Sequence, residues 1–242
     1  MPQRRIAAGL YGRKVGEGFY AYPDGKQVVP AEPAAPAASS KAVWISRAEA
    51  DLAAKVEALL AGAGIAIDKG ETPAADSLCL VTPVGADATS TAVEQGLDAT
   101  RTAAVDALYM DGRLTLMLTA VTSPEARDGL HGALAATGRA VSVINDSVGF
   151  VAQRVVAMIV NISCEIAQQR IARPEDIDIF VKLGLGYPEG PLSLGESMGR
   201  ANVLRVLEGM EKFYGDPRYR ASPWLKRRVL LDLPLGSPEA LV

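Results

Sequence analysis

The stretch VWISRAEADLAAKVEALLAGAG, residues 43–64, decides the fold class, because it predicts one strand followed by one helix. Residues 43–45 are apolar at every position, as in a strand that is buried on both faces. After them, Ser46 with Glu49 three residues later forms a capping-box pattern, which predicts a helix over 46–60. The apolar stripe of this helix consists of Leu52, Val56, Leu59 and Leu60.

The same alternation of strand and helix continues to residue 146 and then stops. Further strands are expected at 65–67, 78–82, 102–107, 114–121 and 141–144, and further helices at 87–95 and 124–136. Beyond residue 147 every expected element is a helix, namely 148–169, 174–183, 201–214 and 223–230. The sequence therefore predicts an α/β sheet domain over 43–146 and an all-α helical domain over 147–232, followed by a tail over 233–242.

The first 42 residues differ from the rest of the chain. Residues 23–42 are rich in Pro, Ala and Ser without an apolar period, which predicts an extended, mobile linker. Before this linker, GRKVGEGFYAY at residues 12–22 combines three glycines with several aromatic rings. Because such rings favour a packed patch over a solvated tail, we expect residues 1–22 to be the end of a domain whose beginning is missing.

Charge and composition exclude some classes of partner. The formal net charge of −3 gives no electrostatic reason to expect nucleic acid or an anionic membrane as a partner. No apolar run reaches the roughly 18 residues that a membrane-spanning helix needs. Cys79 and Cys164 lie far apart in apolar surroundings, which favours reduced, buried thiols and a cytoplasmic location.

The residues offer little catalytic chemistry. A dinucleotide site needs glycines between the first strand and the first helix, but the turn SRAEA at 46–50 has none. Glu49 and Asp51 would also repel phosphate. The single histidine, His131, falls inside an expected helix, and neither metal-ligand spacing nor a nucleophile elbow occurs. The sequence predicts no catalytic, cofactor-binding or metal-binding residue.

The helical part carries a family resemblance. It shows DSVGF, then a long helix, then PEDID, then GLGYPEGPL, within residues 146–192. In this order the motifs resemble the C-terminal helical domain of bacterial 3-hydroxyacyl-CoA dehydrogenases. The resemblance implies a Rossmann-like sheet domain followed by a 6-phosphogluconate dehydrogenase C-terminal-like helical domain. It also implies NAD-dependent oxidation of 3-hydroxyacyl-CoA in fatty-acid or aromatic-acid breakdown, with helical domains that dimerise and close over acyl-CoA.

The opening stretch resembles the same family. GRKVGEGFYAY is similar to the stretch that ends the first helical domain of longer members, which carry a second, degenerate copy behind it. The resemblance thus implies the end of copy one and all of copy two. In copy two Asp106 falls where the family has its catalytic His, Leu116 near its Glu, and Gln153 replaces a helical-domain Asn. Because Asp and Leu cannot reproduce a carboxylate-polarised His, we expect a catalytically silent copy that binds no NAD by itself.

Two sets of residues are candidates for binding. Gln153 and Asn161 share a polar stripe of the long helix, where they either line an acyl-CoA cleft or form a solvated face. We predict that Gln153→Ala leaves folding intact. The opposite face of this helix is apolar and includes Val155, Ile159 and Ile162. We expect these residues to belong to the core of the domain and not to a dimer contact.

Tyr187, Pro188 and Leu192 are the expected interface residues, in the loop GLGYPEGPLSLGE at 184–196. The partner would be a second copy or a missing N-terminal dehydrogenase half, with acyl-CoA as a further ligand. The basic run at 226–228 is either a solvated face or a site for the phosphates of coenzyme A.

Three functions remain open from the sequence. The first is a C-terminal dehydrogenase half that serves dimerisation and substrate shaping. The second is a stand-alone acyl-CoA-binding or scaffold protein. The third is a self-sufficient oxidoreductase with an unusual cofactor site.

Overall fold

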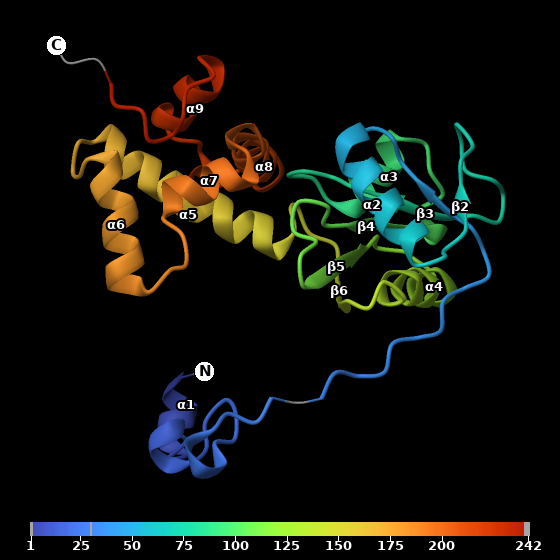
Figure 1. The fold of residues 1–242 in the computed structure, drawn as a ribbon, viewed down its shortest axis with the longest axis horizontal. Helices are drawn as coiled ribbons and strands as arrows, with labels where there is room; N and C mark the ends of the chain where they lie inside the picture. Colours follow the sequence, from blue (N-terminus) through green and yellow to red (C-terminus); the bar gives the residue numbers. More distant parts are fainter. Residues whose placement is uncertain (1, 30, 240–242) are drawn as a thin grey trace. The chain divides into compact units, whose positions relative to one another are not determined.

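The computed structural model of the chain describes residues 2–29 and 31–239. It divides into two compact units, Met1–Ala34 and Ala35–Val242, which are described separately below (Figure 1). No helix among the described residues is long and apolar enough to cross a bilayer. Cys79 and Cys164 are free and buried, as predicted.

The first unit is a small folded segment without a core of its own. It contains helix α1 (Pro2–Ala7) and two 3-10 turns, η1 (Arg13–Val15) and η2 (Pro23–Gly25). The guanidinium of Arg5 donates to the carbonyl of Gly18 and lies 4.1 Å from the ring centre of Phe19. None of the described side chains in this unit is buried. Its residues are therefore held by local hydrogen bonds and ring contacts.

The second unit begins with a six-stranded sheet. Its strands are β1 (Val43–Ile45), β2 (Ile67–Asp68), β3 (Leu78–Val81), β4 (Thr102–Val105), β5 (Arg113–Leu118) and β6 (Ala140–Ile144). The order is β2-β1-β3-β4-β5-β6, and all neighbours are parallel except β4 and β5. After β2 the chain returns across β1 to β3, so the connections switch sides between β1 and β3 (Figure 1).

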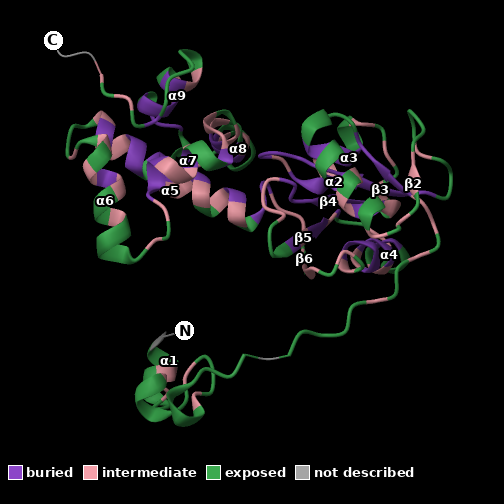
Figure 2. Ribbon diagram, viewed as in Figure 1, coloured by how far each residue is buried: buried purple, intermediate pink, exposed green. Residues whose placement is uncertain are grey.

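Helices cover both faces of this sheet. Helices α2 (Ala50–Gly62) and α4 (Pro124–Ala135) pack on the face that carries the leucine-rich core. The short helix α3 (Ala88–Glu94), which is followed by the 3-10 turn η3 (Ala99–Arg101), and Phe150 cover the other face. Figure 2 shows the resulting buried layer between strands and helices. Ser123 caps α4 by accepting a hydrogen bond from the N–H of Ala126, as the sequence predicts.

The start of α2 differs from the prediction. The helix begins at Ala50 and not at Ser46. The Ser46 hydroxyl accepts from the N–H of Ala48 and donates to the side chain of Gln95 at 2.6 Å, so it is not available as a helix cap. Glu49 occupies the N-cap position but makes no capping hydrogen bond with its side chain. The prediction of a capping box was therefore wrong, because the Ser46 hydroxyl donates a hydrogen bond to the distant residue Gln95.

The second part of this unit is helical. It comprises α5 (Val151–Gln168), α6 (Pro174–Leu185), α7 (Pro191–Met198), α8 (Arg200–Tyr214), the 3-10 turn η4 (Pro217–Tyr219) and α9 (Pro223–Leu230). Helix α5 is central and packs against α7, α8 and α9 (Figure 1).

Helix α7 lies in the stretch that was predicted to be a loop. Its start is capped from α6, because the carboxylate of Asp178 accepts from the N–H groups of Leu192 and Ser193 at 2.8 and 3.1 Å. Gly190 permits this approach, since a Cβ at that position would lie 2.2 Å from the Asp178 carboxyl carbon. The capping residue Asp178 thus lies more than ten residues before α7. The sequence next to α7 therefore gave no N-cap signal for this helix.

Helix α5 presents its polar stripe to the core and part of its apolar stripe to solvent. Gln153, Asn161 and Cys164 are buried, whereas Val155 and Ile162 are 53% and 57% exposed. Asn161 is accommodated because it donates to the carbonyl of Arg220 and accepts from the N–H of Ser222. The expectation that Val155 and Ile162 are core was therefore wrong.

The end of the expected linker lies against α4. A Cβ on Gly132 would come within 2.5 Å of the carbonyl oxygen of Ala37, and one on Gly129 within 3.0 Å of the side chain of Ser39. Residues 37–39 are thus packed on the sheet part of the second unit. The domain boundaries expected from the sequence stay a prediction.

Candidate functional site

The candidate site lies where the carboxyl ends of β1, β3 and β4 meet α5 and α8. In open α/β sheets ligands bind at this edge, beside the point where the connections switch sides. A recess of about 230 Å³ occupies this place. Its lining includes Ser46 and Glu49 after β1, Thr82 after β3, Glu94 from α3 and Arg205 from α8.

An ion pair crosses this recess. Arg205 reaches from α8 to the carboxylate of Glu49, with Nη1 3.2 Å from Oε2. Glu49 stands at the start of α2, the end of a helix that attracts anions. Glu49 therefore puts a negative charge in the turn after the first strand, where this class of fold binds the pyrophosphate of a dinucleotide. With Glu94 beside it and no glycine in the turn, these residues do not fit a nicotinamide cofactor.

Two glycines allow the sheet and the helices to touch through their backbones. A Cβ on Gly209 in α8 would lie 1.9 Å from the carbonyl oxygen of Gly85, and one on Gly85 would lie 2.5 Å from that of Arg205. Gly85 also has a φ of +71°, which favours glycine. The loop after β3 is thereby pressed against α8 beside the recess.

Asp106 and Gln153 join the sheet to α5. Asp106 follows β4 and is buried, and its Oδ1 accepts from the side-chain amide of Gln153 at 2.9 Å and from the N–H of Leu108. The carbonyl oxygen of Gln153 in turn accepts from the N–H of Gly85 at 3.4 Å. One amide side chain therefore bridges two strand ends. The expectation that Gln153→Ala leaves folding intact loses its basis, because Gln153 is not solvated.

Burial changes the proton affinity of this group. It raises the pKa of Asp106 from 3.8 to about 6, against the opposing effect of the Gln153 hydrogen bond. Burial also raises the pKa of nearby Tyr109 to about 12, with Asp106 and Glu189 adding to the shift. Asp106 Oδ2 and the Thr82 hydroxyl have no hydrogen-bond partner among the described residues. The strand ends therefore carry buried polar atoms without partners in the described part of the chain. Asp106 itself does not line the recess.

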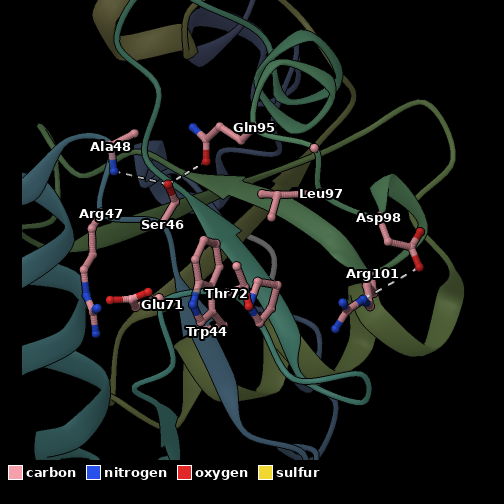
Figure 3. A pocket seen from close by; sticks show the side chains of 12 residues that line it. Trp44, Ser46, Arg47, Ala48, Glu71, Thr72, Gln95, Leu97, Asp98 and Arg101 are labelled. Carbon is pink, nitrogen blue, oxygen red and sulfur yellow. Dashed lines mark hydrogen bonds and ion pairs between the residues drawn. The ribbon is translucent and has the colours of Figure 1, made fainter.

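A larger cleft of about 480 Å³ lies beside the recess, between the loops after β1 and β2 (Figure 3). Trp44 lines it and donates its indole N–H to the carbonyl of Gly70. Arg101 also borders it, and its guanidinium donates to the carbonyl of Ser77 at 2.7 Å and lies 3.7 Å from the Asp98 carboxylate. Arg47 and Glu71 stand at the rim. The cleft offers one ring and charges of both signs, without a dominant charge.

The residues proposed from the sequence are not gathered at one place. Gln153 lies at the junction, whereas Asn161 holds the segment before α9. Tyr187 is half-buried, Pro188 is exposed and Leu192 is buried in α7. Their roles in substrate binding and in an interface stay predictions. The pair Glu49–Arg205 was missed, although Gly209 inside an expected helix signalled a close contact there.

Comparison with known proteins identifies the helical part. Residues 149–234 match the family model described as 3-hydroxyacyl-CoA dehydrogenase, C-terminal domain. The helical part of this chain is therefore similar to the C-terminal domain of 3-hydroxyacyl-CoA dehydrogenases. The 3-hydroxyadipyl-CoA dehydrogenase of Escherichia coli K12 is 35% identical over 125 residues, which are 51% of this chain and 26% of that protein. A probable 3-hydroxybutyryl-CoA dehydrogenase of Deinococcus radiodurans is 36% identical over 37% of this chain and 32% of its own length.

A solved structure of this dehydrogenase family resembles both parts of the second unit. The crystal structure of 3-hydroxybutyryl-CoA dehydrogenase from Escherichia coli K12 matches 95% of this chain and 43% of that chain, with a TM-score of 0.69 and 27% identity. The predicted fold class, a Rossmann-like sheet followed by a helical region, is confirmed. The chain spans only about a quarter to a third of the length of the curated dehydrogenases it matches.

Proposed function

We propose that this chain is the C-terminal half of a 3-hydroxyacyl-CoA dehydrogenase and that it lacks catalytic residues of its own. The whole enzyme would oxidise 3-hydroxyacyl-CoA with NAD in the cytoplasm, in fatty-acid or aromatic-acid breakdown. The observation that carries the proposal is the glycine-free turn after β1, in which Glu49 pairs with Arg205 from α8 beside the recess.

The remaining catalytic positions support the same proposal. Asp106 stands where the family resemblance expects a histidine, and its Oδ1 is engaged by Gln153. Leu116, near the expected glutamate, is fully buried in the apolar core. Neither Asp106 nor Leu116 lines the recess or the cleft described above, so neither residue meets a ligand bound there.

The helical part supports a role in dimerisation and substrate shaping. On α5, Val151, Val155 and Ile162 are each more than half exposed, and an apolar groove of about 480 Å³ runs beside them. Contiguous apolar surface of this kind is typical of interaction sites. The partner would be a second copy or an N-terminal dehydrogenase half, and acyl-CoA would bind the assembled enzyme.

The second candidate is a stand-alone acyl-CoA-binding or scaffold protein. The cleft in Figure 3 favours it, because Trp44 offers an aromatic wall and Arg47 at the rim forms no ion pair among the described residues. Binding of acetyl-CoA by the purified chain, without any dehydrogenase present, would support this candidate.

Turnover tests the main proposal. The purified chain is mixed with acetoacetyl-CoA and NADH, and the loss of NADH absorbance is followed. We expect no turnover above the rate of a blank without protein. Turnover that disappears in Asp106→Asn would overturn the proposal and make the chain an enzyme by itself.

A further inference from the structure

Aromatic rings and arginines gather on the surface at the end of α8. The ring centres of Phe213 and Tyr214 are 5.2 Å apart, and those of Tyr214 and Tyr219 are 5.6 Å apart. Arg154 lies 5.8 Å from the ring centre of Tyr214, and Arg218 lies 5.9 Å from that of Tyr219. Phe213 and Tyr214 are 59% and 42% exposed. We refer to these five residues as the ring patch.

Two cations at the ring patch have no acidic partner in the described part of the chain. Arg218 does have one, because its Nε lies 2.7 Å from the carboxylate of Asp216. Arg154 has only its ring contact, and Arg220, which is exposed directly after Tyr219, forms neither a side-chain hydrogen bond nor an ion pair with described residues. A guanidinium that rests on a ring keeps its N–H groups free for a phosphate.

The basic run of α9 does not supply such free cations. Lys226 lies 3.7 Å from the carboxylate of Glu208, and Arg227 lies 3.2 Å from that of Glu239. Arg228 is buried and donates to the backbone that follows α9. The interpretation of this run as a phosphate site therefore loses its basis, and the unpaired cations stand at the ring patch instead.

Helix α5 fixes the position of both unpaired cations. It carries Arg154 itself. About two turns further along, the buried side chain of Asn161 donates to the carbonyl of Arg220 at 2.9 Å and accepts from the N–H of Ser222 at 2.8 Å. Asn161, which the sequence offered as a residue of an acyl-CoA cleft, thus holds the backbone that carries Arg220.

We propose that Arg154 and Arg220, together with the rings of Tyr214 and Tyr219, bind the nucleotide end of coenzyme A. Guanidinium groups bind phosphate through charge-assisted hydrogen bonds, and an exposed aromatic ring offers a stacking surface for adenine. None of these four residues lines the recess or the cleft in Figure 3. The proposal rests on the proposed function only for the identity of the ligand, because both candidate functions need acyl-CoA.

Calorimetric titration of coenzyme A into the purified chain, without NADH, tests the proposal. We expect saturable binding that Arg154→Gln and Arg220→Gln each weaken about tenfold, since each variant removes a charged hydrogen-bond donor. Arg139→Gln is the matched control, because Arg139 lies just before β6 and also has no ion pair with described residues. This control should bind coenzyme A like the parent.

Two further comparisons separate the phosphate from the adenine. Dephospho-coenzyme A, which lacks the 3′-phosphate, should bind the parent more weakly than coenzyme A does. This difference should disappear in the double variant Arg154→Gln with Arg220→Gln. Tyr214→Leu should weaken the binding of both ligands by the same factor, whereas Tyr214→Phe keeps the ring and should bind like the parent.

Several results would overturn the proposal. They are the absence of saturable binding by the parent, binding that the double variant retains, and an equal loss in Arg139→Gln. Loss of binding in Arg47→Gln but not in the double variant would place the ligand in the cleft of Figure 3. NADH turnover is not measured in these titrations, so a failure of this proposal is distinct from a failure of the proposed function.

Discussion

At the scale of single residues, the chain keeps a proton-binding carboxyl where the family resemblance expects a catalytic histidine. Asp106 is buried with one oxygen unpaired among the residues the structure describes, and only an amide faces it from α5. A buried carboxyl of this kind resists ionisation, and it therefore reports on the junction through the pH dependence of stability.

Asp106→Asn should remove a pH-dependent loss of stability. The folded chain holds the proton up to about pH 6, whereas the unfolded chain releases it near pH 3.8, so folding is favoured at the acid end. The free energy of unfolding then falls as the pH rises from 3.8 to about 6, by at most about 3 kcal/mol. Relative to the parent, Asp106→Asn should gain stability across this window and keep the gain at pH 8.

Urea unfolding between pH 4 and pH 8 measures this difference. Asp111→Asn serves as the control for the loss of one charge, because Asp111 is exposed in the loop that follows. If Asp106→Asn and Asp111→Asn change with pH in the same way, the buried carboxyl does not titrate as described.

At the scale of elements, the contact between the loop after β3 and α8 depends on two glycines. Gly209→Ala places a Cβ within 1.9 Å of the Gly85 carbonyl, so α8 must shift. We expect a loss of roughly 3 kcal/mol in the free energy of unfolding. Gly184→Ala in α6 is the matched control, since its Cβ meets nothing within 4 Å and should be neutral or stabilising by about 0.5 kcal/mol. Equal effects of the two substitutions in thermal unfolding would refute the close packing.

The outer face of α5 should carry self-association. Val155→Asp with Ile162→Asp leaves the core untouched, because both side chains are more than half exposed. We expect the parent to have the mass of a dimer in light scattering at micromolar concentration, and the double variant the mass of a monomer. Val93→Asp is the control, because Val93 lies on α3 and is 68% exposed, and this variant should remain dimeric. A monomeric parent, or a dimeric double variant, would count against this face.

Local signals in the sequence predicted the elements whose ends are determined locally. Pro174 and Pro223 marked the first residues of α6 and α9, because proline at that position needs only its own backbone. Predictions failed where a distant residue decides. Gln95 takes the Ser46 hydroxyl, and Asp178 caps α7 from another helix. The hydrogen-bond partners of Asn161 lie about 60 residues away in the sequence. The residues around Asn161 therefore could not indicate that the polar stripe of α5 faces the core.

At the scale of the whole molecule, the site could be predicted only as an absence of chemistry. The glycine-free turn indicated that the nucleotide site was degenerate, but the arginine that pairs with Glu49 comes from α8, more than 150 residues away. Hydrogen bonds, an ion pair and a backbone contact link the sheet to the helices.

The most direct test of this account is whether the chain binds NADH by itself. Purified protein is titrated into NADH, and the cofactor's fluorescence is followed up to about millimolar protein. We expect no saturable change, because the turn after β1 has no glycine and presents the Glu49 carboxylate, which pairs with Arg205. Saturable binding with a micromolar Kd, weakened by Arg205→Gln, would contradict it, since the recess would then be a working nucleotide site.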